Sequence, residues 1–480
     1  MTWLFQSVGT EGRMVSGAQL RATISEVLCA LVRRGYLEAD LHLAVRVFLF
    51  EHLRRRGRKK PRSLVALFRY GSWQLLLFLP NLLRLRRMKP TRCVVVPASH
   101  RAFGRSGDSA VSKHADSVVR DWAASHGRVL MLETGLGPAF YRSPDGVPII
   151  NISLVVLLLQ RLMTVFSRGS REPAQLVTDA LGELHALPVG LTRRQFSRRV
   201  ERHLDRARGV RRLYSWFIRF APDCELMSVV YYTVDAMALT ASAHLRGCTT
   251  SEYQHGIQND EHPMYALQDM PVDLSTATTL PREFRVWDDV AKRRATRWMS
   301  LYPTAGFCAR VTGNLWLERL KTHQPVADQP SEGSRILIAL QEWPVTFNVA
   351  LIPALGCLDP ETEVIVRLHP RDTDSAELIR RTFEDAPYQG SLVVQMPEAE
   401  PIEAVLARSS LCITGFSTVG VESLQLGKRC LFIHPNAREG LADYIDGQQC
   451  QYAESETDIR AALKAWQQTR SDRQHGRLRA

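Results

Sequence analysis

The feature of the sequence that most constrains the fold is an alternation of short apolar segments with helical patterns. Five such segments in the C-terminal half are expected to be buried strands: 335–340, 363–368, 391–396, 411–414 and 430–433. Helical patterns are expected between them, at 345–355, 375–384, 402–408 and 419–426. Strands that alternate with helices in this way predict a parallel, doubly wound sheet.

The N-terminal half shows the same alternation less regularly. Its expected strands are 92–97, 128–133, 226–231 and 249–254, and its expected helices include 110–126, 192–208 and 234–245. Residues 1–90 show helical patterns with little strand signal, and a polar stretch with two prolines at 321–334 separates the halves. We therefore predict an α/β protein with two Rossmann-like doubly wound domains, 91–325 and 326–480, and an added N-terminal helical segment, 1–90.

The positive charge of the chain is concentrated in one segment. The 480 residues include 62 Lys+Arg and 49 Asp+Glu, a net charge of +13. Residues 54–92 contain thirteen basic residues and no acidic residue, so the remaining residues are balanced. This distribution argues against a protein that coats nucleic acid over its whole surface. A second arginine-rich run at 193–212 nevertheless keeps nucleic-acid binding open as a function.

Two interpretations of residues 54–92 remain open. Basic runs flank an apolar, aromatic run, which is typical of an interfacial helix held against anionic lipid. The alternative is a solvated helical face packed on its own domain. No apolar run reaches the roughly 18–20 residues that span a bilayer, and no signal peptide is evident. We expect a cytoplasmic protein, with peripheral attachment to the inner face of the cytoplasmic membrane under the first interpretation.

The ends of the predicted C-terminal strands carry groups suited to a phosphate. Arg367, His369 and Arg371 follow or end the strand at 363–368 and supply positive charge and hydrogen-bond donors. His434 follows the strand at 430–433, and we expect it to line the same crevice.

A turn and a helix start follow the strand at 411–414. Gly415 permits a tight turn, and Ser417 and Thr418 are good N-caps, so the helix N-terminus can bind an anion. Glu422, one turn later, could accept hydrogen bonds from ribose hydroxyls. Plain capping of a Rossmann helix is the structural alternative.

The N-terminal half offers candidates for proton transfer. Gln254 ends a predicted strand, His255 and Gly256 follow it, and an imidazole there can act as a general base near neutral pH. A histidine bonded to a loop carbonyl is the alternative. Asp108, in a polar loop after the first strand, is a second candidate base, and Asn314 lies at the expected hinge of the cleft.

Other chemistries find less support in the sequence. His262 follows no predicted strand and is set aside. The chain has neither GxGxxG nor GxxxxGK[ST], which argues against a dehydrogenase or a P-loop NTPase. Its nine cysteines form no CxxC pair, so no metal site is expected.

The order of the motifs QHG, RLHP and TGFSTVGVESLQLGK resembles the bacterial capsule and teichoic-acid transferases. These include CDP-glycerol glycerophosphotransferases, capsule Kdo transferases and HP-motif sialyltransferases, and the resemblance covers about residues 240–450. It implies a GT-B fold without a metal or a resident cofactor. It assigns the donor phosphate to His369, Ser417 and Thr418, and the reaction centre to His255. The acidic motif of the sialyltransferases is missing, since Asp108 in SGDS is only a loose match.

The resemblance implies a glycosyltransferase or glycerophosphotransferase of bacterial surface polysaccharide synthesis. Its donor would be a nucleotide-activated group, CMP- or CDP-linked, and its acceptor a glycan or a lipid-linked molecule. A nucleotide-sugar epimerase of the same architecture is the alternative, because it would use the same donor site without an acceptor.

Overall fold

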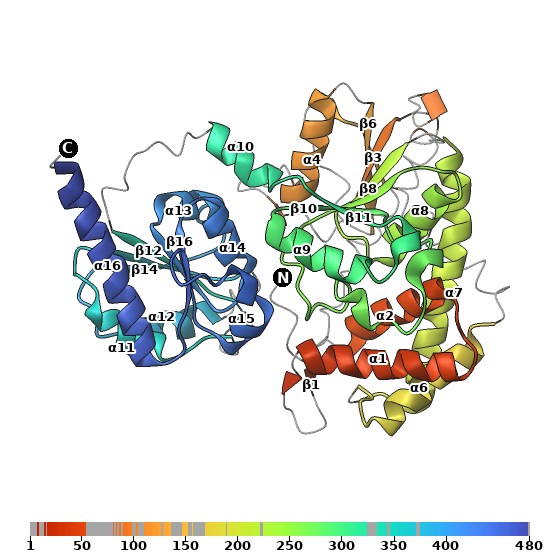
Figure 1. Ribbon diagram of the computed structural model, residues 1–480, viewed down its shortest axis with the longest axis horizontal. Coiled ribbons are helices and arrows are strands. Elements are labelled where there is room, and N and C mark those ends of the chain that lie inside the picture. Colours follow the sequence, from red (N-terminus) through yellow and green to blue (C-terminus); the bar gives the residue numbers. More distant parts are fainter. Residues whose placement is uncertain are drawn as a thin grey trace. The chain divides into compact units, whose positions relative to one another are not determined.

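The chain forms two compact units, Trp3–Trp316 and Leu317–Ala480, each built on one parallel sheet. Figure 1 shows the strands and helices of both units. The computed structural model describes residues 7–8, 14–15, 17–53, 80, 83, 86–87, 90–97, 102–103, 110–125, 128–135, 146–151, 156, 169–188, 190–220, 224–323, 334–341, 343, 346–370 and 375–478.

The N-terminal unit holds a seven-stranded parallel sheet in the order β11-β10-β9-β8-β3-β6-β7. The first strand of this sheet along the chain, β3, lies beside the fourth, β8, so the chain winds first to one side of β3 and then to the other. The strands are β3 (Arg92–Pro97), β6 (Val129–Thr134), β7 (Ile149–Asn151), β8 (Glu225–Ser228), β9 (Thr250–Tyr253), β10 (Glu283–Val286) and β11 (Cys308–Val311).

The C-terminal unit repeats this winding in six strands, in the order β14-β13-β12-β15-β16-β17. This is the 3-2-1-4-5-6 order of nucleotide-binding Rossmann folds, and its switch point lies between β12 and β15. The strands are β12 (Arg335–Ala339), β13 (Glu363–Arg367), β14 (Leu392–Gln395), β15 (Leu411–Thr414), β16 (Arg429–Phe432) and β17 (Cys450–Tyr452).

Helices and minor strands complete the two units. The N-terminal unit contains α1 (Gly17–Arg33), α2 (Ala39–Leu53), α4 (Lys113–Ala124), α6 (Arg171–Glu183), α7 (Arg193–Phe217), α8 (Val234–His244) and α9 (Asp289–Met299); α10 (Leu315–His323) begins there and ends in the next unit. The C-terminal unit contains α11 (Leu351–Ala354), α12 (Ala376–Glu384), α13 (Ile402–Arg408), α14 (Thr418–Gln425), α15 (Pro435–Gly440) and α16 (Glu456–Leu478). Two-residue strands pair as β1 (Ser7–Val8) with β2 (Met14–Val15) and as β4 (Ala102–Phe103) with β5 (Ala110–Val111).

Both faces of the N-terminal sheet are covered, because successive residues of β3 enter opposite cores. Cys93 and Val95 pack with residues of α7 and α8, whereas Val94 and Val96 pack with residues of α4. A strand buried on both faces needs a continuous apolar run instead of an alternating one, and RCVVVP supplies it.

The N-terminal helices belong to the same unit as the first sheet. Helix α1 contacts α6, and α2 contacts α7. Helix α2 is apolar on nearly all sides and is almost entirely buried, as expected for a helix in a core.

The predicted fold class is confirmed: the protein is α/β, with two doubly wound parallel sheets and added N-terminal helices. The units divide after Trp316, and the predicted domain boundaries at 90/91 and 325/326 stay predictions. Most of 54–92 lies outside the described residues. Among the described helices, none is both long and apolar enough to cross a membrane.

A half-buried histidine of α7 should make the N-terminal unit sensitive to acid. Burial, helped by the nearby charge of Arg206, lowers the pKa of His203 from 6.5 to about 3, and its Nε2 lies 3.1 Å from the Ala44 carbonyl oxygen. The unfolded chain therefore binds a proton near pH 6.5 that the folded chain takes up only near pH 3. Stability conferred by the neutral ring is present above pH 6.5 and is lost as the pH falls toward 3.

We expect His203→Gln to flatten this pH dependence. Between pH 7 and pH 5, His203 should lower the free energy of unfolding of the wild-type protein by about 2 kcal/mol. The reason is that pH 5 lies 1.5 pH units below the pKa of the unfolded histidine, and each unit corresponds to about 1.36 kcal/mol. Hydrogen exchange of the α7 amides in urea at pH 7 and pH 5 would measure it. His185→Asn, at an exposed position, is the control. Equal pH dependence in wild type and His203→Gln would contradict the assignment.

Candidate functional site

The carboxyl ends of β12 and β15 meet at the switch point of the C-terminal sheet. The Phe416 backbone N–H, just after β15, donates to Gln341 Oε1, just after β12, at 2.9 Å. Gln341 is only 4% exposed, and its Nε2 has no partner among the described residues. It borders a cavity of about 10 Å³, which holds roughly one water molecule. This edge therefore presents an unused, buried amide donor.

Gly415 is required here by a close approach of the backbone. A Cβ at this position would lie 2.7 Å from Gln341 Oε1 and 2.8 Å from the Thr346 carbonyl oxygen. Any larger residue would push the turn away from β12. The glycine predicted for this turn is thus needed because the turn has no space for a Cβ.

The N-terminus of α14 follows this turn directly. Ser417 is its N-cap, and Ser417 Oγ accepts a hydrogen bond from the Val419 N–H at 3.3 Å. Thr418 Oγ1 is buried and has no partner within the described parts of the chain. Backbone N–H groups and the helix dipole at such a terminus favour a negatively charged group.

His434 lies at the end of β16 and faces the same turn. Its ring centroid is 5.2 Å from that of Phe416. His434 Nδ1 accepts a hydrogen bond from the Asn436 N–H at 3.2 Å, which assigns the ring proton of the neutral form to Nε2. Burial lowers the pKa of His434, so the ring is a neutral N–H donor at pH 7.

Three other predicted phosphate ligands differ in their surroundings. The buried Arg367 guanidinium donates to Gln395 Oε1 at 2.7 Å, to the Pro397 carbonyl oxygen at 2.6 Å and to that of Glu400. Arg367 thus fastens β13 to β14 and the loop beyond it. His369 is half-buried after β13, and Arg371 lies outside the described residues.

Glu422, the predicted ribose ligand, is 3% exposed within α14. It lies one turn beyond the N-cap, as the sequence predicted. The roles assigned to it and to the phosphate ligands stay predictions.

The second group of candidates lies at the carboxyl end of β9 in the N-terminal unit. The Gln254 side chain donates to the Gly256 carbonyl oxygen at 2.8 Å and accepts from the Trp287 N–H at 2.7 Å. Gln254 therefore holds the turn that carries His255 against the end of β10. It shapes this site through the backbone.

His255 lies beside a buried carboxyl group and a phenol. His255 Nδ1 is 3.9 Å from Glu252 Oε1, and His255 Nε2 is 3.4 Å from the Tyr232 hydroxyl. Burial raises the pKa of Glu252 well above its ordinary value, which favours the neutral carboxyl. The 3.9 Å contact is therefore no evidence of an ion pair.

Sequence reasoning missed most of this cluster. Tyr265 donates to Glu252 Oε1 at 2.6 Å, and the His262 ring lies 4.8 Å from that of Tyr265. His262 was set aside because it follows no strand, yet the chain returns it to the end of β9. An acidic residue inside the buried run TSEY of β9 was the available signal.

Arg46 of α2 fixes the loop that carries these residues. It is fully buried and donates to the Ala266 carbonyl oxygen at 2.7 Å and to Asp269 Oδ1 at 2.8 Å. The N-terminal helices therefore help to position the His255 cluster.

The remaining predicted residues lie elsewhere. Asn314 is 2% exposed, in the turn between β11 and α10. The Tyr253 hydroxyl holds this turn, because it donates to the Gly313 carbonyl oxygen at 3.0 Å and accepts from the Leu315 N–H at 2.8 Å. Asp108 lies outside the described residues.

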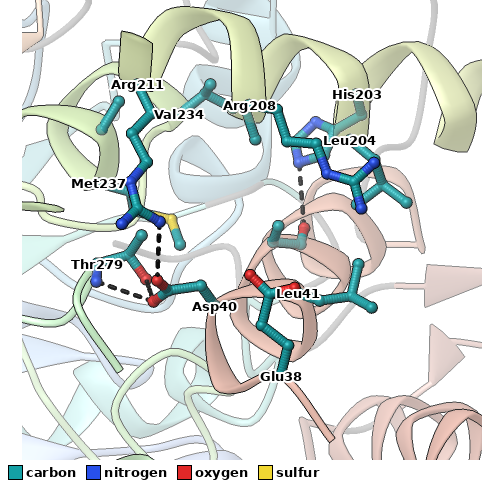
Figure 2. Close-up of a pocket in the computed structure, with 13 residues that line it drawn as sticks. Glu38, Asp40, Leu41, His203, Leu204, Arg208, Arg211, Val234, Met237 and Thr279 are labelled. Carbon is teal, nitrogen blue, oxygen red and sulfur yellow. Dashed lines mark hydrogen bonds and ion pairs between the residues drawn. The ribbon is translucent and has the colours of Figure 1, made fainter. Parts of the chain in front are cut away.

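A separate cavity of about 70 Å³ lies among α2, α7 and α8 (Figure 2). Leu41, Leu204 and Met237 line it, with charged side chains at its border. Asp40 there accepts from the Thr279 N–H at 2.9 Å and pairs with Arg211 at 3.2 Å. Its lining comes from three helices and two loops, unlike that of the strand-end sites. Within the described parts of the chain, no group of three or more His, Cys, Asp or Glu side chains could hold a metal ion.

Comparisons with known proteins give structural similarity alone. No protein-family model and no curated protein matches the chain. Among solved structures, it is similar to UDP-GlcNAc 2-epimerase from Neisseria meningitidis bound to UDP-GlcNAc, with 13% identity, a TM-score of 0.44 and coverage of 80% of this chain and 92% of that one.

Two further solved structures are similar to a comparable degree. Acinetobacter baumannii MurG has 12% identity, a TM-score of 0.42 and coverage of 80% and 92%. Anabaena HepE in complex with UDP and glucose has 12% identity, a TM-score of 0.43 and coverage of 80% and 91%. Similarity this low carries no argument about activity.

Two buried glutamines of the N-terminal site should respond differently to removal of their amides. Gln254→Leu leaves the Trp287 N–H without an acceptor, so we expect it to lower the free energy of unfolding by about 2 kcal/mol. Gln258, 6% exposed, has an Nε2 without a partner among the described residues, so Gln258→Leu should change stability by less than about 0.5 kcal/mol. Urea unfolding of both variants measures this difference. Equal losses would contradict the hydrogen-bond assignment.

Proposed function

We propose that this protein is a GT-B-type transferase that uses a nucleotide-activated donor. The observation that carries the proposal is the switch point between β12 and β15. There, a glycine without space for a Cβ, a helix N-terminus and the Gln341 amide donor, which has no partner among the described residues, lie together. Ligands of open α/β sheets bind at such a point, and phosphates bind at such helix N-termini.

In this proposal the donor phosphates bind at the N-terminus of α14. Ser417 Oγ uses a lone pair for the Val419 N–H, so its own proton is available to a phosphate oxygen. Thr418 Oγ1, Gln341 Nε2 and His434 Nε2 are further donors. Donors fixed before the reaction stabilise the charge that develops on the leaving phosphate. His369 and Arg371 would contribute from the end of β13.

His255 would take the proton of the acceptor hydroxyl. Burial favours the neutral form of Glu252, so before the reaction the carboxyl places little negative charge beside the imidazole. The proton taken from the acceptor stays on His255, and Glu252 Oε1, 3.9 Å from Nδ1, would stabilise the imidazolium electrostatically. Asp108 is the alternative base.

The finer assignments rest on the resemblance of the motifs. They are a CMP- or CDP-linked glycosyl or glycerophosphoryl donor, a glycan or lipid-linked acceptor, and a role in bacterial surface polysaccharide synthesis. The basic segment 54–92 would dock on the inner face of the cytoplasmic membrane, where such an acceptor is made.

A second candidate is a nucleotide-sugar epimerase. It is favoured by the number of proton-transfer groups in one cluster, since His255, Glu252 and His262 lie around Tyr232 and Tyr265. Incubation of a panel of nucleotide sugars in deuterated water without acceptor would separate the two. Solvent deuterium in the sugar would support the epimerase.

We expect one nucleotide among CMP, CDP, UDP and GDP to raise the melting temperature of the C-terminal unit. A ligand at 100 times its Kd stabilises the folded state by about 2.7 kcal/mol. Ser417→Ala should weaken the binding of that nucleotide at least tenfold, because the substitution removes a hydroxyl donor and the N-cap of α14. Thermal unfolding against nucleotide concentration measures both effects.

Ser455→Ala is the matched control. Ser455 Oγ accepts a hydrogen bond from the Asp458 N–H at 3.1 Å at the start of α16. Loss of this cap should lower the free energy of unfolding by about 1 kcal/mol without weakening nucleotide binding. Equal weakening in both variants, or near-wild-type turnover of both Ser417→Ala and His369→Ala, would exclude the proposed donor site.

A further inference from the structure

Helix α7 presents a row of arginines on its outer face. Arg194, Arg198 and Arg202 follow one another at intervals of four residues, so they share one face of this 25-residue helix. All three are exposed, and Arg199 and Arg212 beside them are exposed too. At 1.5 Å per residue the helix is about 37 Å long. In Figure 1 it is the long yellow-green helix of the N-terminal unit.

Within the described parts of the chain, these arginines have no ion-pair partner, unlike arginines on other surface helices. In α12, Glu377 pairs with Arg380 at 2.7 Å and with Arg381 at 3.2 Å. In α16, Glu456 pairs with Arg460 at 2.8 Å. In α7, the residue one turn before Arg198 is Arg194, and the residue one turn before Arg202 is Arg198. Glu201 and Asp205 lie three residues after Arg198 and Arg202, yet no described residue forms an ion pair with any of the three arginines.

The inner face of α7 shows that unpaired arginines are not general to this helix. Arg211 pairs with Asp40, and His203 Nε2 bonds the Ala44 carbonyl oxygen, so both hold α7 to α2 (Figure 2). Arg206, at the edge of the face, pairs with Asp235 at 3.2 Å. Unpaired charge is thus concentrated on the outward side, where repulsion between like charges one turn apart costs stability.

We propose that the outer face of α7 binds the surface of an anionic lipid bilayer. A straight row of guanidinium groups can reach the phosphates of a flat surface together. Trp216 supports a bilayer in particular: it is 46% exposed and lies at helical spacing from Arg198 and Arg212, on the same side. An indole beside arginines suits the headgroup region of a bilayer, where the ring contacts apolar chains and the N–H can bond polar headgroups or water.

This surface is independent of the transferase site and of residues 54–92. It is formed by described residues of one helix, and it requires no particular donor or acceptor. Its test therefore uses the full chain, in which segment 54–92 is the same in every variant.

The experiment is co-sedimentation with vesicles of phosphatidylglycerol and phosphatidylcholine at several salt concentrations. Replacement of the three arginines, R194Q together with R198Q and R202Q, should weaken binding about a hundredfold, as expected for about 1 kcal/mol per basic residue. The dependence on salt should also become shallower. The melting temperature should not fall, because like charges are removed.

The matched control is R380Q together with R381Q and R460Q, which removes the same charge from paired positions and should change vesicle binding by less than about twofold. Unchanged binding in the α7 variant would overturn the proposal. So would equal losses in the two variants, or tighter wild-type binding to nucleic acid or a soluble anionic polysaccharide than to vesicles at the same salt.

Discussion

The C-terminal site depends on the hydrogen bond from the Phe416 N–H to Gln341 Oε1. This bond joins the ends of β12 and β15, the two strands between which the winding of the sheet reverses. It exists only because Gly415 lets the backbone come this close. The same short distance sets the direction in which α14 starts from Ser417, and it leaves Gln341 Nε2 beside that helix. One steric constraint thus forms the turn and places its donors.

The two units share the same winding but carry different groups at the carboxyl ends of their strands. The C-terminal edge carries small residues, backbone N–H groups and the neutral His434, which suit an anion that must be bound without proton exchange. The N-terminal edge carries His255 and Glu252, buried groups that can exchange protons. Burial acts on both edges: it lowers the pKa of His434 and raises that of Glu252, so it favours the neutral form of each.

The sequence predicts best those features that depend on neighbouring residues. The run EVIVR of β13 and the turn after β15 were recognised because burial and turn chemistry are local. The short strands β7 and β17 were missed, because three residues give too little pattern. His262 was missed because the fold brings it back to the end of β9, whereas Gln341 directly follows a predicted strand and could have been found there. Arg367 shows a further limit, since its position was predicted but not the carbonyl oxygens that surround its guanidinium.

The positions of the arginines along a helix carry information that the net charge of the chain does not. A count of basic residues treats Arg381 and Arg198 alike, yet one stands a turn after a glutamate and the other a turn after an arginine. An arginine neutralised within its own helix has little attraction left for a partner. A row of uncompensated arginines keeps a field that extends about one Debye length, roughly 8 Å at physiological salt. The spacing of opposite charges along a helix therefore says more about partners than net charge does, and in α7 it indicates an anionic surface.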